Sequence, residues 1–326
     1  MLHKLLALCA AIALTSALTP AAHAQAYPAR PVIMVVPFAA GGPTDVLARI
    51  MAERMGRSLG QTVVVENTTG AAGSIGVGRV AKAPNDGYTV GIGHWSTHVV
   101  NGAIYPLTYD MLKDLDPVAM IASNPQLIVS KNAVPAKDLK ELTAWVKANQ
   151  EKISVGTAGV GAASHVGGVY YQNIIGAKLQ YIPYRGTGPA LQDLMAGHLD
   201  IMLDQASNSL PQVRAGKIRA YAVTAKTRMP SAPDIPTVDE AGVPGLYIAI
   251  WHAFWVPHGA PRPVINRLNA AAVEALADPA VRQRLLDMGQ EIPAREQQTP
   301  EALAAYHKAE VDKWWPLIKA AGIKGE

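Results

Sequence analysis

The sequence predicts an α/β protein of two lobes, each lobe a mainly parallel sheet flanked by helices. From Pro31 onward, short β-branched runs alternate with longer segments of helical period, and glycine, proline or a small polar residue stands at each junction. This alternation is typical of parallel strands joined by crossover helices. A length of 326 residues favours about two domains. The balance of 49% hydrophobic against 17% charged residues excludes a disordered chain.

Two strand-loop-helix units open the predicted fold. A strand at residues 32–36 leads into a loop at residues 37–45, and the helix after it carries an apolar stripe. The plan repeats with a strand at 63–65, a loop at 66–73 and a helix of small residues that begins near Ser74. The stripe of the first helix consists of Leu47, Met51, Met55 and Leu59.

The rest of the chain continues the alternation. An amphipathic helix is predicted at 135–149, followed by a strand at 153–155, a glycine-rich loop at 156–161 and a helix that opens near Ser164. Beyond these, we expect strands at 89–92, 201–204, 219–224 and 253–256, and helices at 263–277 and 300–315.

Two breaks in composition divide the chain into lobes. One lies at Ser123-Asn124-Pro125, and the other is a proline-rich stretch from Arg228 to Gly245. We therefore predict a discontinuous first lobe with the second lobe inserted into it, and a C-terminal helix that packs back across both. The predicted boundaries are 27–124 with 228–295 for lobe 1, 125–227 for lobe 2 and 296–326 for the C-terminal helix.

The first 24 residues have the pattern of a cleavable signal peptide. Lys4 precedes an apolar run at 5–18, and the small residues Ala22-His23-Ala24 follow it. The run is shorter than the roughly 20 residues of a membrane span. Its removal takes away Cys9, the one cysteine of the chain, so thiol chemistry and disulfides are excluded. The sequence thus predicts a secreted protein whose mature chain lacks cysteine.

The loops at 37–45, 66–73 and 156–161 share one chemistry. Each has small side chains, many backbone N–H groups and a helix N-terminus directly behind it, which is the composition of an anion cradle. None has the Gly-Lys-Ser/Thr ending of a phosphate loop, and Gly159 to Ser164 fails the dinucleotide fingerprint. We therefore favour a carboxylate ligand, with no cofactor and no metal. A net charge of +4 from dispersed basic residues does not indicate nucleic-acid binding.

Individual side chains leave alternatives open. Arg185 is a cation within a glycine-rich turn, where it either meets a ligand carboxylate or pairs with a surface acid. Phe38 and Trp95 stand at strand ends, where they form apolar walls around a ligand, although Trp95 equally suits the core. His94 and His98 lack the intervening glutamate of a zinc-protease helix, which favours hydrogen bonding or packing over metal binding.

The chain resembles the Bug-type solute receptors of the tripartite tricarboxylate transporter family along almost its whole mature length. The resemblance rests on five motifs taken in order: Pro37 to Arg49, Asn67 to Gly76, Ser96-Thr97-His98, Pro183 to Gly186 with Pro189-Ala190, and Asp193-Leu194 with Gly197 to Asp200. It implies a two-lobed periplasmic binding protein, of the Venus-flytrap type II kind, that closes on a small organic acid and delivers it to a membrane permease. It also implies a monomer with no catalytic residues.

In that family, backbone N–H groups, hydroxyls and ordered water hold the carboxylate. The sequence departs from the family at Val99-Val100-Asn101-Gly102, where Asn-Pro is common after a Ser-Thr-His-Ala motif. Asp45 is unusual beside an anion, so we expect it to bind an amine or hydroxyl or to stabilise its helix. Carried over by position and joined by Arg185, the expected ligand contacts are Phe38, Ala40, Gly41, Asp45, Ala72, Gly73, Ser74, Ser96, Thr97, His98, Gly161, Ser164, Tyr184, Arg185 and Asp204.

The sequence leaves two rival functions open. A secreted α/β hydrolase would use Ser74 or Ser164 as nucleophile, with His98 or His165 as base. A periplasmic sensor would use the same fold to signal to a membrane kinase. The ligand class is equally open, since dicarboxylates, aromatic carboxylates and amino acids all satisfy backbone donors of this kind.

Overall fold

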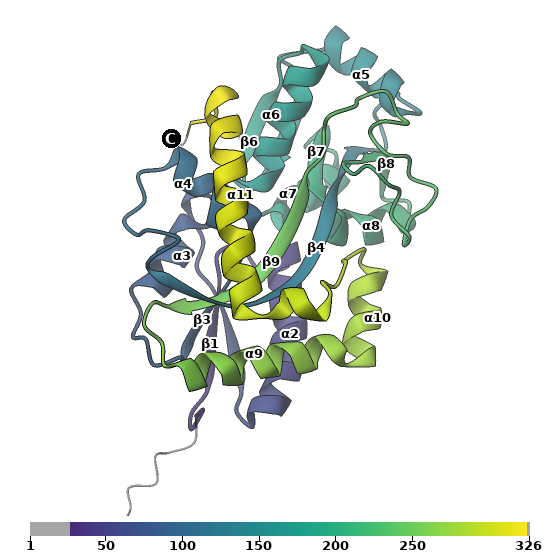
Figure 1. Cartoon of the computed structure of the whole chain (residues 1–326). Coiled ribbons are helices and arrows are strands. Elements are labelled where there is room, and N and C mark those ends of the chain that lie inside the picture. The colour runs from purple at the N-terminus through teal and green to yellow at the C-terminus, as the bar shows by residue number, and fades with distance from the viewer. Residues whose placement is uncertain (1–26, 325–326) are drawn as a thin grey trace, which may run out of the picture.

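The computed structural model describes residues 27–324, so the predicted signal peptide lies outside the described residues. The strands form one continuous curled sheet that spans two lobes, in the order β2-β1-β3-β9-β4-β7-β5-β6, with β8 paired to β4 (Figure 1). This confirms the predicted α/β class and the two lobes. The strands are β1 (Val32–Val36), β2 (Val63–Asn67), β3 (Thr89–His94), β4 (Leu115–Lys131), β5 (Ser154–Thr157), β6 (Gln180–Pro183), β7 (Ile201–Gln205), β8 (Ile218–Val223) and β9 (Ala249–Pro257).

The sheet is mixed rather than mainly parallel. Parallel pairing joins β1 to β2 and β3 in lobe 1, and β5 to β6 and β7 in lobe 2, as the repeated strand-helix units require. Antiparallel pairing enters through β4 and β9, which pair with each other and with β3, β7 and β8. Each lobe therefore consists of a parallel unit closed by antiparallel crossing strands.

Strand β4 is the longest element that the sequence analysis did not predict. It contains Pro117 and Pro125, and proline is disfavoured inside strands because it cannot donate to the ladder. Residues 115–125 pair with β9 in lobe 1, whereas residues 126–131 pair with β7 and β8 in lobe 2. The break at Ser123-Asn124-Pro125 thus marks the passage of a single strand between lobes.

The proline-rich connector lies against lobe 2. The backbone N–H of Val238 donates to the carbonyl of Val223 (3.0 Å), and that of Ile248 donates to the carbonyl of Thr224 (3.1 Å). Strand β9 then starts at Ala249 and joins the sheet of lobe 1. The boundary at residue 228 stays a prediction, and these bonds favour a position near residue 248.

The helices pack on the two faces of each sheet. In β1, Met34 and Val36 belong to the core beneath the first helix, and Val35 belongs to the core on the opposite face. Burial on both faces explains the unbroken apolar run. The helical segments are α2 (Pro43–Leu59), η2 (Ala71–Gly73), α3 (Ser74–Ala81), the π-helix η3 (Ser96–Val100), α4 (Asn101–Ile104), α5 (Leu139–Ala148), α6 (Ala163–Ile175), α7 (Thr187–Ala196), α8 (Ala206–Arg214), α9 (Arg262–Ala277), α10 (Pro279–Asp287), η4 (Arg295–Gln298) and α11 (Pro300–Ala320).

Helix α11 runs from the lower lobe toward the upper one beside β4 (Figure 1). Glu310 on this helix is almost fully buried, and its Oε2 accepts hydrogen bonds from the indole N–H groups of Trp251 (3.2 Å) and Trp314 (3.1 Å). A third indole, that of Trp315, donates to the carbonyl of Val99 (2.9 Å). The C-terminal helix therefore ties itself to β9 and η3 by polar bonds as well as by packing.

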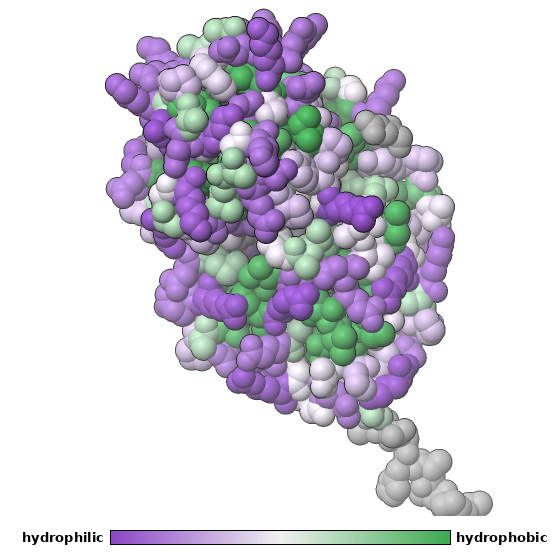
Figure 2. All heavy atoms as spheres, turned by 180° about the vertical axis from the view of Figure 1, so that it is seen from behind, coloured by the Kyte–Doolittle hydropathy of each residue, from purple (hydrophilic) through white to green (hydrophobic). Residues whose placement is uncertain are grey.

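The opposite face of the molecule is mostly polar, with apolar side chains gathered in its lower part (Figure 2). Large exposed apolar residues include Val64 on β2 and Ile75 on α3, both in lobe 1. Within residues 27–324, no helix combines the length and apolarity that crossing a membrane requires.

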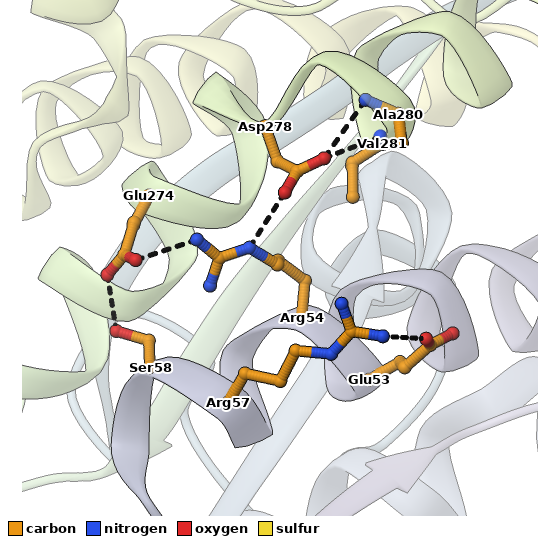
Figure 3. Close-up of polar contacts among 8 residues, drawn as sticks. All are labelled: Glu53, Arg54, Arg57, Ser58, Glu274, Asp278, Ala280 and Val281. Atoms are coloured by element: carbon orange, nitrogen blue, oxygen red, sulfur yellow. Dashed lines mark hydrogen bonds and ion pairs between the residues drawn. The ribbon is translucent and has the colours of Figure 1, made fainter.

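A cluster of charges joins α2 to α9 and α10 (Figure 3). Arg54 donates to Asp278 (2.9 Å) and to Glu274 (2.7 Å), and Ser58 donates to the second oxygen of Glu274 (2.5 Å). Asp278 also caps α10, because it accepts from the N–H groups of Ala280 and Val281. One guanidinium thus bridges two carboxylates, one of which holds a helix end.

Four histidines are buried where β3, β9, η3 and α11 meet. The ring of His98 stacks on Trp255 at 3.6 Å, and the rings of His94 and His252 lie 5.2 Å apart. Burial lowers the pKa of His94 to about 3 and lowers the pKa values of His98, His252 and His307 as well. All four rings are therefore neutral in the folded protein at pH 7.

We expect Arg54→Met to lower the midpoint of thermal unfolding by several degrees, since Asp278 and Glu274 lose their shared partner. Arg57→Met is the matched control. Arg57 lies on the same helix but is 68% exposed and pairs only with Glu53 one turn away, and such exposed pairs contribute little. Equal shifts in the two variants would contradict the bridging role of Arg54.

We also expect the free energy of unfolding to fall as the pH drops from 7.5 to 5.0. The unfolded histidines bind protons below about pH 6.5, whereas the buried rings do not, so unfolding takes up protons and becomes easier in acid. His94 alone contributes about 2 kcal/mol to this loss between pH 6.5 and 5. Urea titrations at both pH values measure the effect, and equal stability at both would refute it.

Candidate functional site

A small cavity of about 20 Å³ lies between the two lobes. A wider vestibule of about 720 Å³ lies beside it, and both spaces share Phe38 and Ala158 in their walls. The cavity is lined by Phe38, Gly42, Pro43, Thr44, His94, Gln126, Ala158, Ala162, Ala163, Ser164, Thr187, Asp204 and Gln205. The vestibule is lined by Phe38, Ala39, Gly70, Ala71, Ala72, Gly73, Tyr105, Ala158, Gly159, Val160, Pro183, Tyr184, Arg185 and Pro189.

Four helices begin at the wall of this cavity. The first residues of α2, α6 and α7 and the residue that precedes α8 all belong to its lining. In the described structure, none of these four helix starts has a side-chain cap hydrogen bond. The first N–H groups of a helix lack partners inside the helix and carry the positive end of its dipole. Four such ends around one space favour an anion there.

The ionisable side chains of the cavity add no positive charge. Within the described part of the chain, its lining includes no lysine or arginine. His94 stacks flat against Phe38 at 5.0 Å, and burial lowers its pKa to about 3, so its ring is neutral at pH 7. Burial raises the pKa of Asp204 to about 6, and hydrogen bonds from Ser209 and Asn208 oppose this shift only in part. Attraction of an anion therefore depends on backbone dipoles.

Seven of the predicted ligand contacts come together around these two spaces, although they belong to different lobes. Phe38, Ser164 and Asp204 line the inner cavity. The vestibule is also lined by Phe38, together with Ala72, Gly73, Tyr184 and Arg185.

The remaining predicted contacts do not line either space. They are Ala40, Gly41, Asp45, Ser74, Ser96, Thr97, His98 and Gly161. Their assignment as ligand contacts stays a prediction, and the side-chain bonds of Asp45, Ser74 and Thr97 support the loops.

Asp45 illustrates this supporting role. Its carboxylate accepts hydrogen bonds from the backbone N–H of Gly41 (2.9 Å), from Arg49 (3.0 Å) and from the amide of Asn67 (2.9 Å). Burial raises the pKa of Asp45, but these bonds outweigh it and hold the pKa below its ordinary value. The contacts favour the second role considered for Asp45, that of fixing its loop and helix.

The Ser96–Val100 π-helix and the residues after it brace the loops from within. Thr97 Oγ1 accepts from the backbone N–H of His94 (2.9 Å) and donates to the carbonyl of the same residue (3.0 Å). Asn101, which stands where the sequence departs from the family pattern, donates to the carbonyl of Ala72 (3.1 Å) and to Ser74 Oγ (2.9 Å). The departure therefore places an amide that fixes the second glycine-rich loop.

The serines proposed for hydrolysis are engaged elsewhere. Ser164 Oγ accepts from the backbone N–H of Ala158 (3.0 Å), and Ser74 Oγ accepts from Asn101. His165 Nδ1 accepts from the backbone N–H of Gly161 (3.3 Å), and His98 Nδ1 bonds to Thr97 Oγ1 (2.9 Å). Among residues 27–324, no hydrogen bond joins Ser74 or Ser164 to a histidine ring, so the geometry does not favour a nucleophile-base pair.

Several lining residues escaped the sequence analysis. Gly42 and Thr44 lay within the predicted first loop, and Thr187 starts a helix directly after the Tyr184-Arg185-Gly186 turn, so a helix-start signal could have found them. Gln126 and Gln205 carried no such signal. They reach the cavity because Gln126, inside β4, is the register partner of Gln205, the last residue of β7.

The lobes touch at the rim of the cleft. The backbone N–H of Ala39 donates to the carbonyl of Arg185 (3.0 Å), and the hydroxyl of Tyr105 donates to the carbonyl of Val160 (2.6 Å). A Cβ atom added to Gly188 would lie 2.9 Å from backbone atoms of Gly41 and Gly42. Only glycine allows this approach, so the structure represents a closed arrangement of the lobes.

Comparison with known proteins relates this architecture to a receptor family. The family model described as "Tripartite tricarboxylate transporter family receptor" matches residues 47–323. The solved structure of the periplasmic binding protein BugD is 42% identical, has a TM-score of 0.89, and the match covers 92% of this chain and 100% of that one.

Two further solved structures contain ligands. MatC from Rhodopseudomonas palustris, with bound malate, is 39% identical with a TM-score of 0.87, over 90% of this chain and 100% of that one. A second R. palustris protein, with adipate, is 33% identical with a TM-score of 0.87, over 91% of this chain and 99% of that one. On this match across most of its length, the chain belongs to the tripartite tricarboxylate transporter receptor family, among its Bug-type periplasmic solute-binding proteins.

Proposed function

We propose that this protein is a periplasmic receptor that captures a small organic carboxylate in the interlobe cleft and delivers it to a tripartite tricarboxylate-type membrane permease. The observation that carries this proposal is the convergence of four uncapped helix N-termini on a cavity whose described lining has no lysine or arginine. The malate- and adipate-bound relatives support a carboxylate ligand. The signal-peptide pattern at residues 1–24 supports the periplasmic location.

The protein acts by binding and closure, with no chemical step. The two lobes are joined by β4 and β9, which therefore form the hinge, and a bound ligand bridges helix ends from both sides. To shift the lobes from 1:99 to 99:1 in favour of closure, a ligand must prefer the closed form by about 5.5 kcal/mol. A few hydrogen bonds to a charged group, at roughly 1.5–3 kcal/mol each, supply that preference.

A thermal-shift screen of organic acids tests the function. We expect at least one small carboxylate to raise the melting temperature by several degrees at concentrations about 100 times its dissociation constant, because it binds the folded form only. The neutral amide of the same acid is the matched control, and it should have no effect because it lacks the anion. Equal shifts with acid and amide would contradict recognition by helix dipoles.

Closure itself is tested with Gly188→Ala. The added methyl group would collide with the backbone of Gly41 and Gly42 across the cleft, so ligand affinity should fall by about tenfold or more. Stability without ligand should be unchanged, since the collision exists only in the closed form. Gln192→Ala, on the exposed side of the same helix, is the control. Calorimetry showing wild-type affinity for Gly188→Ala would mean that binding does not require this closure.

A further inference from the structure

Two acceptor atoms in the cavity residues lack partners. Asp204 and Gln126 both line the cavity and are fully buried, and within residues 27–324 neither Asp204 Oδ1 nor Gln126 Oε1 has a hydrogen-bond partner. The other atoms of these groups are occupied. Asp204 Oδ2 accepts from Asn208 (2.7 Å) and Ser209 (2.5 Å), and Gln126 Nε2 lies 3.5 Å from the carbonyl of Leu203.

The position of these atoms follows from the sheet. Gln126 stands opposite Gln205, and Leu127 stands opposite Asp204, in the antiparallel ladder of β4 and β7. Since side chains alternate between the two faces of a strand, Gln126 and Asp204 stand on opposite faces of the sheet. Both nevertheless line the cavity, beside the starts of α6, α7 and α8, and the strand pairing fixes the backbone of both.

Unpaired buried acceptors are costly. Leaving such a group without a donor incurs the cost of its desolvation, which is larger when the group is charged. Burial raises the pKa of Asp204 to about 6, while the hydroxyl and amide groups of Ser209, Asn208 and Thr187 only partly restore it. One oxygen of the Asp204 carboxyl group therefore lacks a hydrogen-bond donor, although the surrounding helix N-termini carry N–H donors.

The cavity contains both hydrogen-bond donors and unpaired hydrogen-bond acceptors. Helix N-termini offer N–H donors that suit a carboxylate, whereas Asp204 Oδ1 and Gln126 Oε1 accept and suit a donor. A second ligand carboxylate beside Asp204 would meet repulsion, with no cationic side chain in the described lining to offset it. A hydroxyl or ammonium group at the same place would satisfy the unpaired acceptors.

We infer that Asp204 and Gln126 determine specificity, by selecting carboxylates that also carry a hydrogen-bond donor, as hydroxy acids and amino acids do, over the unsubstituted acids of the same skeleton. This inference rests on the proposed function as a carboxylate receptor and names the class of ligand for that site.

Matched sets of acids test the inference by isothermal titration calorimetry. Each set holds the carbon skeleton constant and varies only the donor: propionate, lactate and alanine; succinate, malate and aspartate; phenylacetate, mandelate and phenylglycine. In the set that binds, we expect the hydroxyl or ammonium member to bind at least about tenfold more tightly than its parent. The ratio between the hydroxyl and ammonium members shows which donor the site prefers.

The variant Asp204→Asn assigns the effect to this residue. Its amide oxygen keeps the bonds to Asn208 and Ser209, which turns an NH₂ donor toward the ligand, so the preference for donor-bearing members should fall to about onefold or reverse. Gln126→Leu should reduce the preference by a smaller factor. Asp234→Asn, which removes the same charge from an exposed site, should leave it unchanged. Thermal unfolding of each variant verifies that it is folded.

The outcomes separate the two proposals. A parent acid that binds as tightly as its hydroxyl and ammonium partners overturns the inference and leaves the carboxylate receptor intact. A preference that persists in folded Asp204→Asn and Gln126→Leu also overturns it. Failure of every acid here and in the thermal-shift screen would overturn the receptor function itself.

Discussion

The antiparallel pairing of β4 with β9 is the constraint on which the rest of the structure depends. These strands stay paired from Leu115 opposite Pro257 to Pro125 opposite Ala249, and only β4 continues into the second lobe. Both lobes are thus built on β4, which pairs with β9 in the first lobe and with β7 and β8 in the second. The carboxyl ends of the parallel strands of each lobe consequently face the space between them, where ligands bind in open α/β sheets.

This placement explains how an anion can be attracted without cationic side chains. A helix that follows each strand starts at the strand's carboxyl end, so the same edge that forms the cleft collects helix N-termini. The dipoles are fixed by the fold and need no reorganisation when a ligand arrives. Small residues at these starts, such as Gly42 and Ala162, keep the N–H groups accessible.

Support for these loops comes from side chains outside the linings of the cavity and the vestibule. Asp45 fixes the first loop through Gly41, Arg49 and Asn67, and Asn101 fixes the second through Ala72. Polar residues of this kind resemble ligand contacts in the sequence, because both stand in glycine-rich turns. Their side chains point to the loop backbone, so they shape the cavity from behind its wall.

The α/β alternation, the glycine-rich loops at strand ends and the two lobes can be predicted from the sequence, because periodicity and turn residues are local properties. It could not reveal β4, since Pro117 and Pro125 oppose strand formation locally and only pairing with β9, β7 and β8 overrides them. Tertiary structure alone decided which polar side chains line the cavity. Gln126 and Asp204 both line it because β4 pairs with β7 across a gap of many residues, and no local pattern records that pairing.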